Sequence, residues 1–447
     1  MIRAAPKPLG AADPVRGAGL PTGLDLRGPL GRAILWLAVG LAAVSVRGQA
    51  PTFAASGPDA AAYGEADNYP VGNRETWGTK PFVVGSHSRF DSIFPTHRVA
   101  RAKQAWQFSR ADAAPAIRYD FKGKTYTLED YLGHFPVTGL LILQGDTILL
   151  ERYHYGRTDK DAFVTASMAK SVLSLLAGIA LGDGSFHSLE DEAARYVPEL
   201  SGALYGEATL RSLLQMSSGV TFETTVNGVK GTEKTQVLID GLFDPRANPL
   251  ALLAAASPRA HPVGTHFDYS PGDNETLGIA LRRATGKTLS EYLSERLWQP
   301  MGAEADASWW ADPTGQEFPS AGFSAVLRDY ARLGRLLAHD GNWNGRQLVP
   351  RQYLLDATTH RPEDRHLAPG LPSPYYGYGY QFWIFPGERR MFMMWGAKSQ
   401  YVFVDPLSKL VMVQTSVYSE GVDSGNGNSE CMALWLGLVR QLGEEPQ

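Results

Sequence analysis

The sequence predicts an α/β (α+β) fold, in which an antiparallel sheet is flanked by helices and carries an inserted, mostly helical lobe. Two observations predict it. Runs rich in β-branched and aromatic residues lie at 137–156 and again within 378–416, whereas helical periodicity dominates residues 186–354 between them. Strands on both sides of a helical middle imply one sheet assembled from segments that are distant in the sequence.

The individual elements follow in chain order. Gln144-Gly145-Asp146 separates two β-rich runs and predicts a hairpin, and an apolar helix then runs from Lys170 to a stop at Gly182-Asp183-Gly184. Further helical segments are predicted at 188–200, 209–219, 275–286, 287–302, 325–341 and 430–443. The late strands are predicted at 378–385, 390–396 and 400–416.

The N-terminal residues carry the pattern of a secretory signal. Arg27 and Arg32 precede a largely apolar run at 33–46, and the small residues Gly48 and Ala50 follow at the two positions where a signal peptidase prefers them. The apolar run is short for a spanning helix, which needs about 20 residues. We expect a periplasmic or secreted protein cleaved near Ala50. An uncleaved anchor is the alternative, and it would be the expected route to a membrane.

Composition divides the chain into three parts. These are a leader with the signal peptide (1–50), an N-terminal extension or linker (51–110) and a main domain (111–447), with an α/β lobe at about 125–185 and 355–447 and a helical lobe at about 186–354. The extension is rich in Gly, Ala, Pro and Asp. Its aromatic residues, Trp77, Phe82, Phe90 and Phe94, are expected to anchor it to the surface of the main domain.

Bulk composition narrows the classes of function. With 447 residues and 44% hydrophobic content, the chain is long enough for a large core. The net charge of -4 and the absence of a basic tract argue against nucleic acid as a partner. The single cysteine, Cys431, permits no intramolecular disulfide, and no zinc-binding pattern is present. We therefore expect neither a metal nor another cofactor, and a small molecule as the partner.

Ser167 and Lys170 lie at the N-terminal end of the predicted apolar helix. Their three-residue spacing places both side chains on one helical face, about 5–6 Å apart at Cβ. A serine needs an adjacent base to become a nucleophile, and a partly buried lysine loses affinity for its proton. The free N–H groups at the helix start would favour a developing oxyanion. On spacing alone, a capping serine and a lysine reaching to solvent remain the alternative.

Other motifs in the same order make the pattern specific. The runs are "ASMAKSVLSLLAGIALGDG", "SLEDEAARYVPEL", "TLRSLLQMSSGV", "FDYSPGDNETLGIALRRATGKTLSEYLSERLWQPMG" and "SAGFSAVLRDYARLGRLL". Together they resemble the serine β-lactamase and penicillin-binding-protein-like superfamily, nearest its class C branch. The pattern is most similar to 6-aminohexanoate-dimer hydrolases and related carboxylesterases. The resemblance covers roughly residues 125–447 and implies a β-lactamase/transpeptidase-like fold.

The resemblance assigns roles to residues. It implies that Ser167 is acylated, that Lys170 is its partner, and that Tyr269 carries a proton between the lysine and the leaving group. A phenol beside a cationic lysine would have its anion stabilised and could serve as base and then acid. Gly396 fits the start of the late-strand motif of these hydrolases. In that register the Ala397 N–H joins the Ser167 N–H as an oxyanion hole.

Two departures from the family pattern affect the substrate. Pro271 stands where relatives have Asn or Ser, so the polar contact is lost or taken over by Ser270, Asp273 or Asn274. The late Lys-Thr-Gly motif is replaced by "MWGAKSQYVFVDP", in which Lys398 becomes the candidate contact for a substrate carboxylate. Gly396 and Trp395, with Met393, Met394 and the aromatic residues of 375–383, are expected to line the cleft. The alternative for these aromatic side chains is sheet core and surface loop.

The expected function is that of an exported serine hydrolase cleaving an ester or amide through an acyl-enzyme on Ser167. Loss of the amide contact at Pro271 predicts faster turnover of esters than of amides. Two alternatives remain. One is action on β-lactams or D-Ala peptides, and the other is a binding or sensor domain that kept the fold without catalysis.

Overall fold

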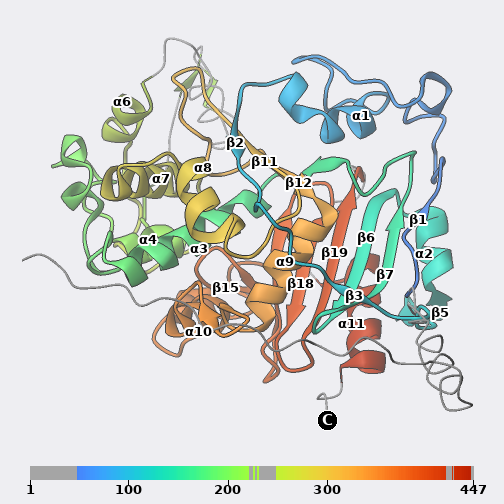
Figure 1. The fold of residues 1–447 in the computed structure, drawn as a ribbon. Coiled ribbons are helices and arrows are strands. Elements are labelled where there is room, and N and C mark those ends of the chain that lie inside the picture. The colour runs from blue at the N-terminus through green and yellow to red at the C-terminus, as the bar shows by residue number, and fades with distance from the viewer. Residues whose placement is uncertain are drawn as a thin grey trace, which may run out of the picture. The chain divides into compact units, whose positions relative to one another are not determined.

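The computed structural model (Figure 1) describes residues 48–220, 225–226, 229–230, 248–418, 425 and 427–443. The predicted signal segment at 33–46 lies outside the described residues. No helix among the described ranges is long and apolar enough to cross a membrane.

A nine-stranded sheet organises the main domain, and its strand order is β1-β7-β6-β19-β18-β17-β16-β15, with β3 also paired to β7. The strands are β1 (Thr52–Phe53), β3 (Ser109–Arg110), β6 (Val137–Gln144), β7 (Thr147–Tyr153), β15 (Gly377–Tyr378), β16 (Trp383–Ile384), β17 (Phe392–Gly396), β18 (Gln400–Asp405) and β19 (Leu410–Ser416). The predicted hairpin, β6–β7, pairs antiparallel with the late strand β19. The prediction of a single sheet built from distant segments is therefore confirmed.

The central strands are buried on both faces because their side chains alternate between two cores. Leu141, Val402 and Val413 belong to one hydrophobic cluster, and Leu140, Tyr401 and Met412 belong to the other. Helix α9 (Leu327–Ala338) packs on the first face and α11 (Glu430–Leu442) on the second (Figure 1). These strands therefore read as nearly continuous apolar runs rather than as alternating ones.

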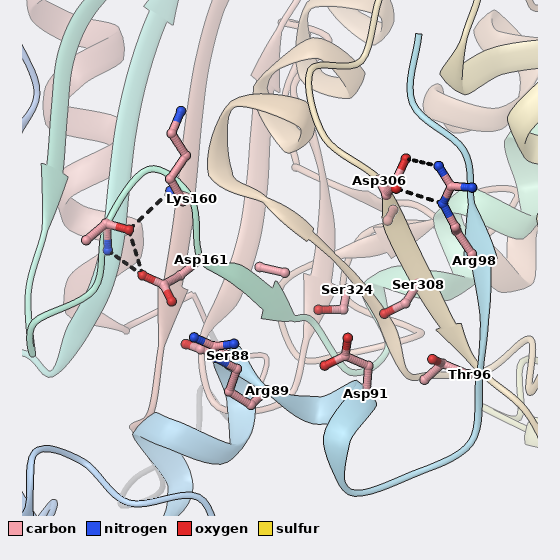
Figure 2. A pocket seen from close by; sticks show the side chains of 13 residues that line it. Ser88, Arg89, Asp91, Thr96, Arg98, Lys160, Asp161, Asp306, Ser308 and Ser324 are labelled. Atoms are coloured by element: carbon pink, nitrogen blue, oxygen red, sulfur yellow. Dashed lines mark hydrogen bonds and ion pairs between the residues drawn. The ribbon is translucent and has the colours of Figure 1, made fainter. Parts of the chain in front are cut away.

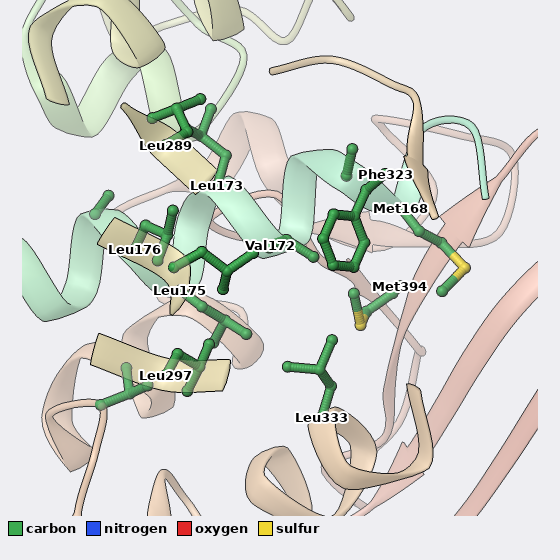
Figure 3. Close-up of a cluster of buried hydrophobic side chains, with 14 of the residues drawn as sticks. Met168, Val172, Leu173, Leu175, Leu176, Leu289, Leu297, Phe323, Leu333 and Met394 are labelled. Carbon is green, nitrogen blue, oxygen red and sulfur yellow. The ribbon is translucent and has the colours of Figure 1, made fainter. Parts of the chain in front are cut away.

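Helix α3 (Met168–Asp183) lies within the first core. Met168, Val172, Leu175 and Leu176 project from it into a cluster that also holds Leu297, Leu333 of α9 and Met394 of β17 (Figure 3). Burying one such aliphatic side chain contributes about 1.5–3 kcal/mol. The apolar sequence that follows Lys170 thus fixes the position of the helix and of the residues at its start.

The remaining helices and turns surround α3 and the sheet edges. They are α1 (Val83–Ser88), α2 (Leu128–His134), α4 (Leu210–Leu214), α6 (Pro249–Ala254), α7 (Pro271–Thr285), α8 (Leu289–Leu293) and α10 (Arg351–Thr358). Single turns are η1 (Glu65–Asp67), η2 (Phe90–Ser92), η3 (Ala193–Arg195), η4 (Pro198–Leu200), η5 (Ser294–Trp298) and η6 (Arg365–Leu367). Small hairpins pair β4 (Arg118–Phe121) with β5 (Lys124–Thr127), β9 (Thr225–Val226) with β10 (Val229–Lys230), and β13 (Asn342–Trp343) with β14 (Arg346–Gln347).

The extension at 51–110 differs from the linker that its composition predicted. Besides β1 and β3, it supplies β2 (Thr96–Val99) to a four-stranded sheet with β11 (Ala307–Trp310), β12 (Phe323–Val326) and β8 (Ala162–Val164). Phe90 and Phe94 lie 5.6 and 5.1 Å from Trp310 between ring centroids, as expected of anchors. A Gly- and Pro-rich segment folds here because partner strands and aromatic contacts hold it.

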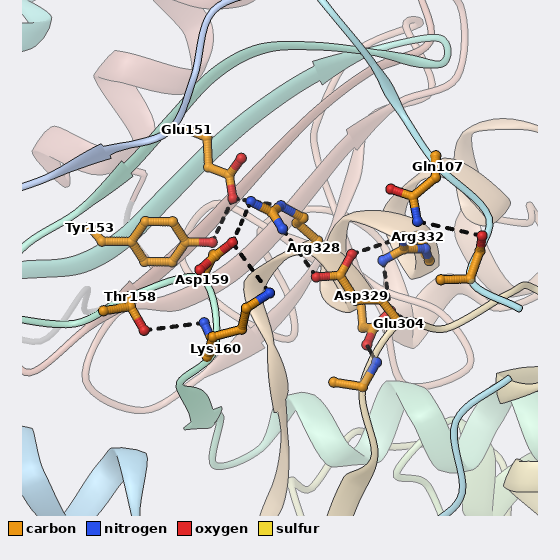
Figure 4. A network of polar contacts seen from close by, with 12 residues as sticks. Gln107, Glu151, Tyr153, Thr158, Asp159, Lys160, Glu304, Arg328, Asp329 and Arg332 are labelled. Carbon is orange, nitrogen blue, oxygen red and sulfur yellow. Dashed lines mark hydrogen bonds and ion pairs between the residues drawn. The ribbon is translucent and has the colours of Figure 1, made fainter. Parts of the chain in front are cut away.

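The helical lobe is also less uniform than predicted. Within 186–354, β11 and β12 are strands, and α9 packs on the main sheet rather than in a separate lobe. A network of buried charges fixes the start of α9 (Figure 4). Arg328 pairs with Glu151 of β7 at 2.8 Å and with Asp159 at 2.9 Å, and Tyr153 donates to Glu151. Buried charges need such partners, so this network specifies where α9 meets β7.

Candidate active site

Ser167 stands between β8 and α3. After β8 the chain turns at Ala166, whose φ of 42° is left-handed, and Ser167 then precedes the first residue of α3. A residue with a Cβ adopts this conformation only where surrounding structure holds it. Ser167 is half-buried, whereas the helix beyond it is buried. The hydroxyl is therefore presented at the N-terminus of a helix whose remaining turns are fixed by the core.

Lys170 is placed to act on Ser167. Its Nζ lies 3.2 Å from Ser167 Oγ and donates to the backbone carbonyl of Ser320 at 2.8 Å. The residue is 4% exposed, and burial lowers the pKa of its amine from 10.5 to about 7. At neutral pH a large fraction of the amine is therefore uncharged and able to accept a proton.

Tyr269 joins this pair from the start of another helix. It precedes Ser270, which caps α7, and Pro271, which occupies the first helical position, where a missing N–H costs nothing. The Nζ of Lys170 lies 4.9 Å from the centroid of the Tyr269 ring. Burial raises the pKa of Tyr269 to about 12, opposed by a hydrogen bond with Ser167. With this raised pKa the phenol is protonated at neutral pH, and its role in proton transfer stays a prediction.

The end of β17 approaches the serine segment at Gly396. A Cβ on Gly396 would lie 2.3 Å from the carbonyl oxygen of Thr165, so glycine alone fits without displacement. Ala397 follows at an exposed position in the β17–β18 turn. Gln400 holds this turn by donating from Nε2 to Ser416 O at 2.6 Å. The close approach brings the turn that holds Ala397 beside the serine segment, and the pairing of the Ala397 and Ser167 N–H groups stays a prediction.

Lys398 lies in the same turn with a left-handed φ of 63°. It is half-buried, and burial lowers the pKa of its amine. Its charge acts on His87 of α1, whose pKa is lowered to about 3 by burial and then by Lys398. No sequence pattern indicates His87, because only the fold brings the extension to this turn.

Asn274 differs from its predicted role as a substrate contact. It is fully buried in α7, its Nδ2 donates to Gln381 Oε1 at 3.1 Å, and its Oδ1 accepts from Ser320 Oγ at 3.4 Å. One helical turn beyond Pro271 the side chain points into the core. The sequence indicated neither Ser320 nor Gln381. Ser320 contacts Lys170 through its backbone carbonyl, so its residue type does not predict the contact.

Aromatic side chains gather beside Tyr269. The Trp383 ring stacks on Tyr269 at 6.0 Å and lies 5.0 Å from the Trp395 ring, and Phe267 lies 6.1 Å from Trp383. Trp383, Trp395 and Phe267 are each half-buried. Met393 and Met394, predicted to line the cleft, are instead fully buried on opposite faces of β17. The period of two in a strand separates Met394 from both Met393 and Trp395, and Met393 lies on the face of Trp395 but within the core.

A different, polar pocket of about 610 Å³ lies over the four-stranded sheet (Figure 2). Its charged lining residues are Arg89, Asp91, Arg98, Lys160, Asp161 and Asp306. Arg98 and Asp306 neutralise one another there through a two-pronged contact. None of the predicted site residues lines this pocket. Within the described part of the chain, no cluster of three or more His, Cys, Asp or Glu side chains has the arrangement of a metal site.

Known proteins resemble this chain in sequence and in fold. The family model described as Beta-lactamase matches residues 127–424. The 6-aminohexanoate-dimer hydrolase of Paenarthrobacter ureafaciens is 25% identical over 351 residues, covering 77% of this chain and 88% of that protein. A solved structure from Bacillus anthracis, provisionally assigned as a 6-aminohexanoate-dimer hydrolase, superposes with a TM-score of 0.72 at 25% identity, over 83% of this chain and 97% of that one.

A penicillin-binding-protein homologue from Caulobacter crescentus shares the fold. Its TM-score is 0.53 at 19% identity, and the match covers 69% of this chain and 93% of that one. The β-lactamase/transpeptidase-like fold expected from the sequence is thus confirmed.

Proposed function

The chain belongs to the β-lactamase family, and on that premise we propose that it is a serine hydrolase that cleaves an ester or amide through an acyl-enzyme on Ser167. One observation carries the proposal. A buried amine whose pKa is lowered to about 7 lies 3.2 Å from the hydroxyl of a half-buried serine at a helix start. A capping serine with a solvated lysine would not require that burial.

The proposed reaction begins as neutral Lys170 accepts the hydroxyl proton of Ser167 while Oγ attacks the substrate carbonyl carbon. The N–H groups of Ser167 and Ala397 stabilise the resulting oxyanion. Tyr269, protonated at neutral pH because burial raises its pKa to about 12, donates a proton to the leaving oxygen or nitrogen and regains one from the Lys170 ammonium. Water then attacks the acyl carbon while Lys170 accepts its proton, the bond between that carbon and Ser167 Oγ breaks, and the proton passes to Oγ, which restores the serine and releases the acid.

The substrate class follows from the surroundings of Tyr269. The half-buried rings of Trp383, Trp395 and Phe267 favour an apolar acyl or alcohol group. Pro271 offers no side-chain hydrogen bond, and Asn274 is committed to Gln381 and Ser320. A site that makes fewer hydrogen bonds to an amide discriminates less in its favour, and esters also have the better leaving group. Short to medium-chain esters are the proposed preferred substrates.

A carboxylate-bearing amide is the second candidate substrate. Lys398 supplies a positive charge in the turn that carries Ala397, and its acid partner would be the substrate carboxylate. The relative at 25% identity from Paenarthrobacter ureafaciens is a 6-aminohexanoate-dimer hydrolase, which favours this candidate over β-lactams.

Export is part of the proposal. It rests on Arg27, Arg32 and the apolar run at 33–46, which have the order of a secretory signal. Cleavage near Ala50 would leave β1, which begins at Thr52, on the mature chain. N-terminal sequencing of protein from the native host tests it, and an intact Met1 in a cytosolic fraction would exclude it.

Covalent labelling tests the catalytic part. A fluorophosphonate probe should label the wild-type protein and leave Ser167→Ala unlabelled, with Ser185→Ala as a control that keeps labelling. Turnover of nitrophenyl esters, linear amides and nitrocefin then ranks the substrates. Equal labelling of wild type and Ser167→Ala would reject the acyl-enzyme, and efficient nitrocefin turnover would favour a β-lactamase.

A further inference from the structure

Gln381 lies in the turn between β15 and β16 and is strained in its backbone. It is 2% exposed and has a φ of 66°, a left-handed conformation that is unfavourable for a glutamine. Such strain persists where many contacts hold the residue, and it concentrates near functional sites. The contacts of Gln381 identify what it holds.

The first group of hydrogen bonds connects Gln381 to the neighbouring helices α4 and α3. Its Nε2 donates to the carbonyl oxygens of Leu213 and Leu214 in α4, at 3.1 and 3.0 Å. Its own carbonyl oxygen accepts from Ser171 Oγ at 2.6 Å, and Ser171 directly follows Lys170 in α3. Gln381 therefore joins α4 to the turn of α3 that carries the lysine.

The second group of hydrogen bonds connects Gln381 to the amine of Lys170 through Asn274 and Ser320. Since carbonyl oxygens only accept, the Leu213 and Leu214 carbonyls force Gln381 Oε1 to face the other way, toward Asn274. Asn274 Nδ2 donates to that oxygen at 3.1 Å, which turns Asn274 Oδ1 toward Ser320 Oγ at 3.4 Å. The Ser320 carbonyl accepts from Lys170 Nζ at 2.8 Å. Each amide thus has one orientation, and the chain of contacts ends at the proposed base.

A third contact connects Gln381 to the surroundings of Tyr269 through Tyr378. Tyr378 donates from its hydroxyl to Gln381 Oε1 at 3.3 Å, and its ring lies 6.4 Å from the Tyr269 ring in an edge-on arrangement. Tyr378 is 2% exposed, so this arrangement belongs to the core. Gln381 Oε1 is shared by the side chains that lead to Lys170 and to Tyr269.

We propose that Gln381 is a positioning residue for the Ser167–Lys170–Tyr269 centre, acting through Asn274 and Ser320. This inference rests on the proposed function. Gln381 holds the Ser320 carbonyl where it accepts a hydrogen bond from one N–H of the Lys170 amine. The lone pair of the amine then faces the Ser167 hydroxyl. Because a displacement of about 1 Å can slow a reaction about 100-fold, a residue that never touches substrate can still control turnover.

The test uses substitutions that respect the left-handed backbone. Gln381→Gly keeps the φ and deletes the side chain, and Gln381→Asn tolerates the φ but is too short to reach both α4 and Asn274. Either variant should lower kcat about 10- to 100-fold with KM changed less than threefold. The acid limb of the kcat/KM profile should move upward from about pH 7, because water admitted beside Asn274 and Ser320 would rehydrate the Lys170 amine.

A double-mutant cycle shows whether Asn274 lies on the same path. Gln381→Gly combined with Asn274→Ala should lose little more kcat than either single variant. Gln144→Ala is the matched control, since Gln144 Nε2 also bridges two carbonyls, of Ser408 and Leu442, at the far end of β6. The control should lose stability in thermal unfolding and keep its kcat and pH profile.

The outcomes separate this inference from the proposed function. Both Gln381 variants with kcat within threefold of wild type, an unmoved acid limb, or full additivity with Asn274→Ala would each overturn the positioning role. Fluorophosphonate labelling of Ser167 in wild type would in that case still support the serine hydrolase. Wild type that resists labelling, with Ser167→Ala as active as wild type, would reject the proposed function and the positioning role together.

Discussion

The amine of Lys170 lies 3.2 Å from the hydroxyl oxygen of Ser167 and 2.8 Å from the carbonyl oxygen of Ser320, in a site where the lysine is 4% exposed. The hydroxyl and the carbonyl are both neutral, and burial is the cause of the lowered pKa of the amine. This combination keeps the Lys170 amine partly uncharged near pH 7.

The pH dependence of kcat/KM should have one limb in the neutral range. Lys170 must be uncharged to accept a proton, and its pKa is about 7, so activity should rise through pH 7 and then level off. Tyr269 adds no second limb below about pH 10, because its pKa is raised to about 12. Steady-state rates from pH 5 to 10 measure this. A midpoint near the ordinary lysine value of 10.5 would contradict the role of Lys170.

Lys170→Met should stabilise the fold at neutral and lower pH. The pKa of Lys170 in the folded protein is depressed from 10.5 to about 7, so the lysine costs no stability above pH 10.5, and its cost grows as the pH falls from 10.5 to 7 and is fully present below 7. The variant should gain about 2–4 kcal/mol in free energy of unfolding at pH 6 and less at pH 10. Urea unfolding at both pH values measures the difference. A gain that does not change with pH would count against a buried, depressed lysine.

Tyr269→Phe should fold normally and lose about 10²- to 10⁴-fold in kcat, since it removes one proton-transfer group. The ring, and with it the stacking on Trp383, is retained. Tyr292→Phe is the matched control, because that hydroxyl bonds Asp183 at the far end of α3. Its turnover should equal that of wild type. Turnover of Tyr269→Phe within a few-fold of wild type would assign the proton transfer to another group.

Gly396→Ala should lower kcat about 10²- to 10³-fold, as loss of one oxyanion-hole donor does. The added Cβ would lie 2.3 Å from Thr165 O, so β17 must move away from the serine segment and take the Ala397 N–H with it. Gly133→Ala in α2 is the control, because its Cβ meets no atom within 4 Å. An unchanged kcat in Gly396→Ala would show that Ala397 takes no part in catalysis.

Pro271→Asn should raise the ratio of amide to ester turnover, since it places an amide side chain where the resemblance to the family implies Asn or Ser. The change removes a proline from the first position of α7, which should lower stability slightly, and Ser270 still caps the helix. Values of kcat/KM for matched ester and amide substrates give the ratio. A ratio equal to that of wild type would mean that the missing contact does not set the preference.

Much of the fold was predictable because local patterns survive in the structure. The hairpin at Gln144-Gly145-Asp146 and the helix after Lys170 lie where turn signals and apolar periodicity placed them. The extension at 51–110 was misjudged for the opposite reason. Its short strands β1 and β2 have no strong pattern of their own and form by pairing with β7 and β11, which are distant in sequence.

The sequence by itself determined the family pattern and the candidate residues: the spacing of Ser167 and Lys170 and the register of Tyr269 and Gly396. Only the tertiary structure decided their properties. Burial set the pKa of Lys170 to about 7 and that of Tyr269 to about 12, and Asn274 faces the core rather than the substrate. The reason is that spacing along a helix is a local property. Desolvation depends on the surrounding fold, and the carbonyl of Ser320 comes from a segment 150 residues away, which only folding brings to Lys170.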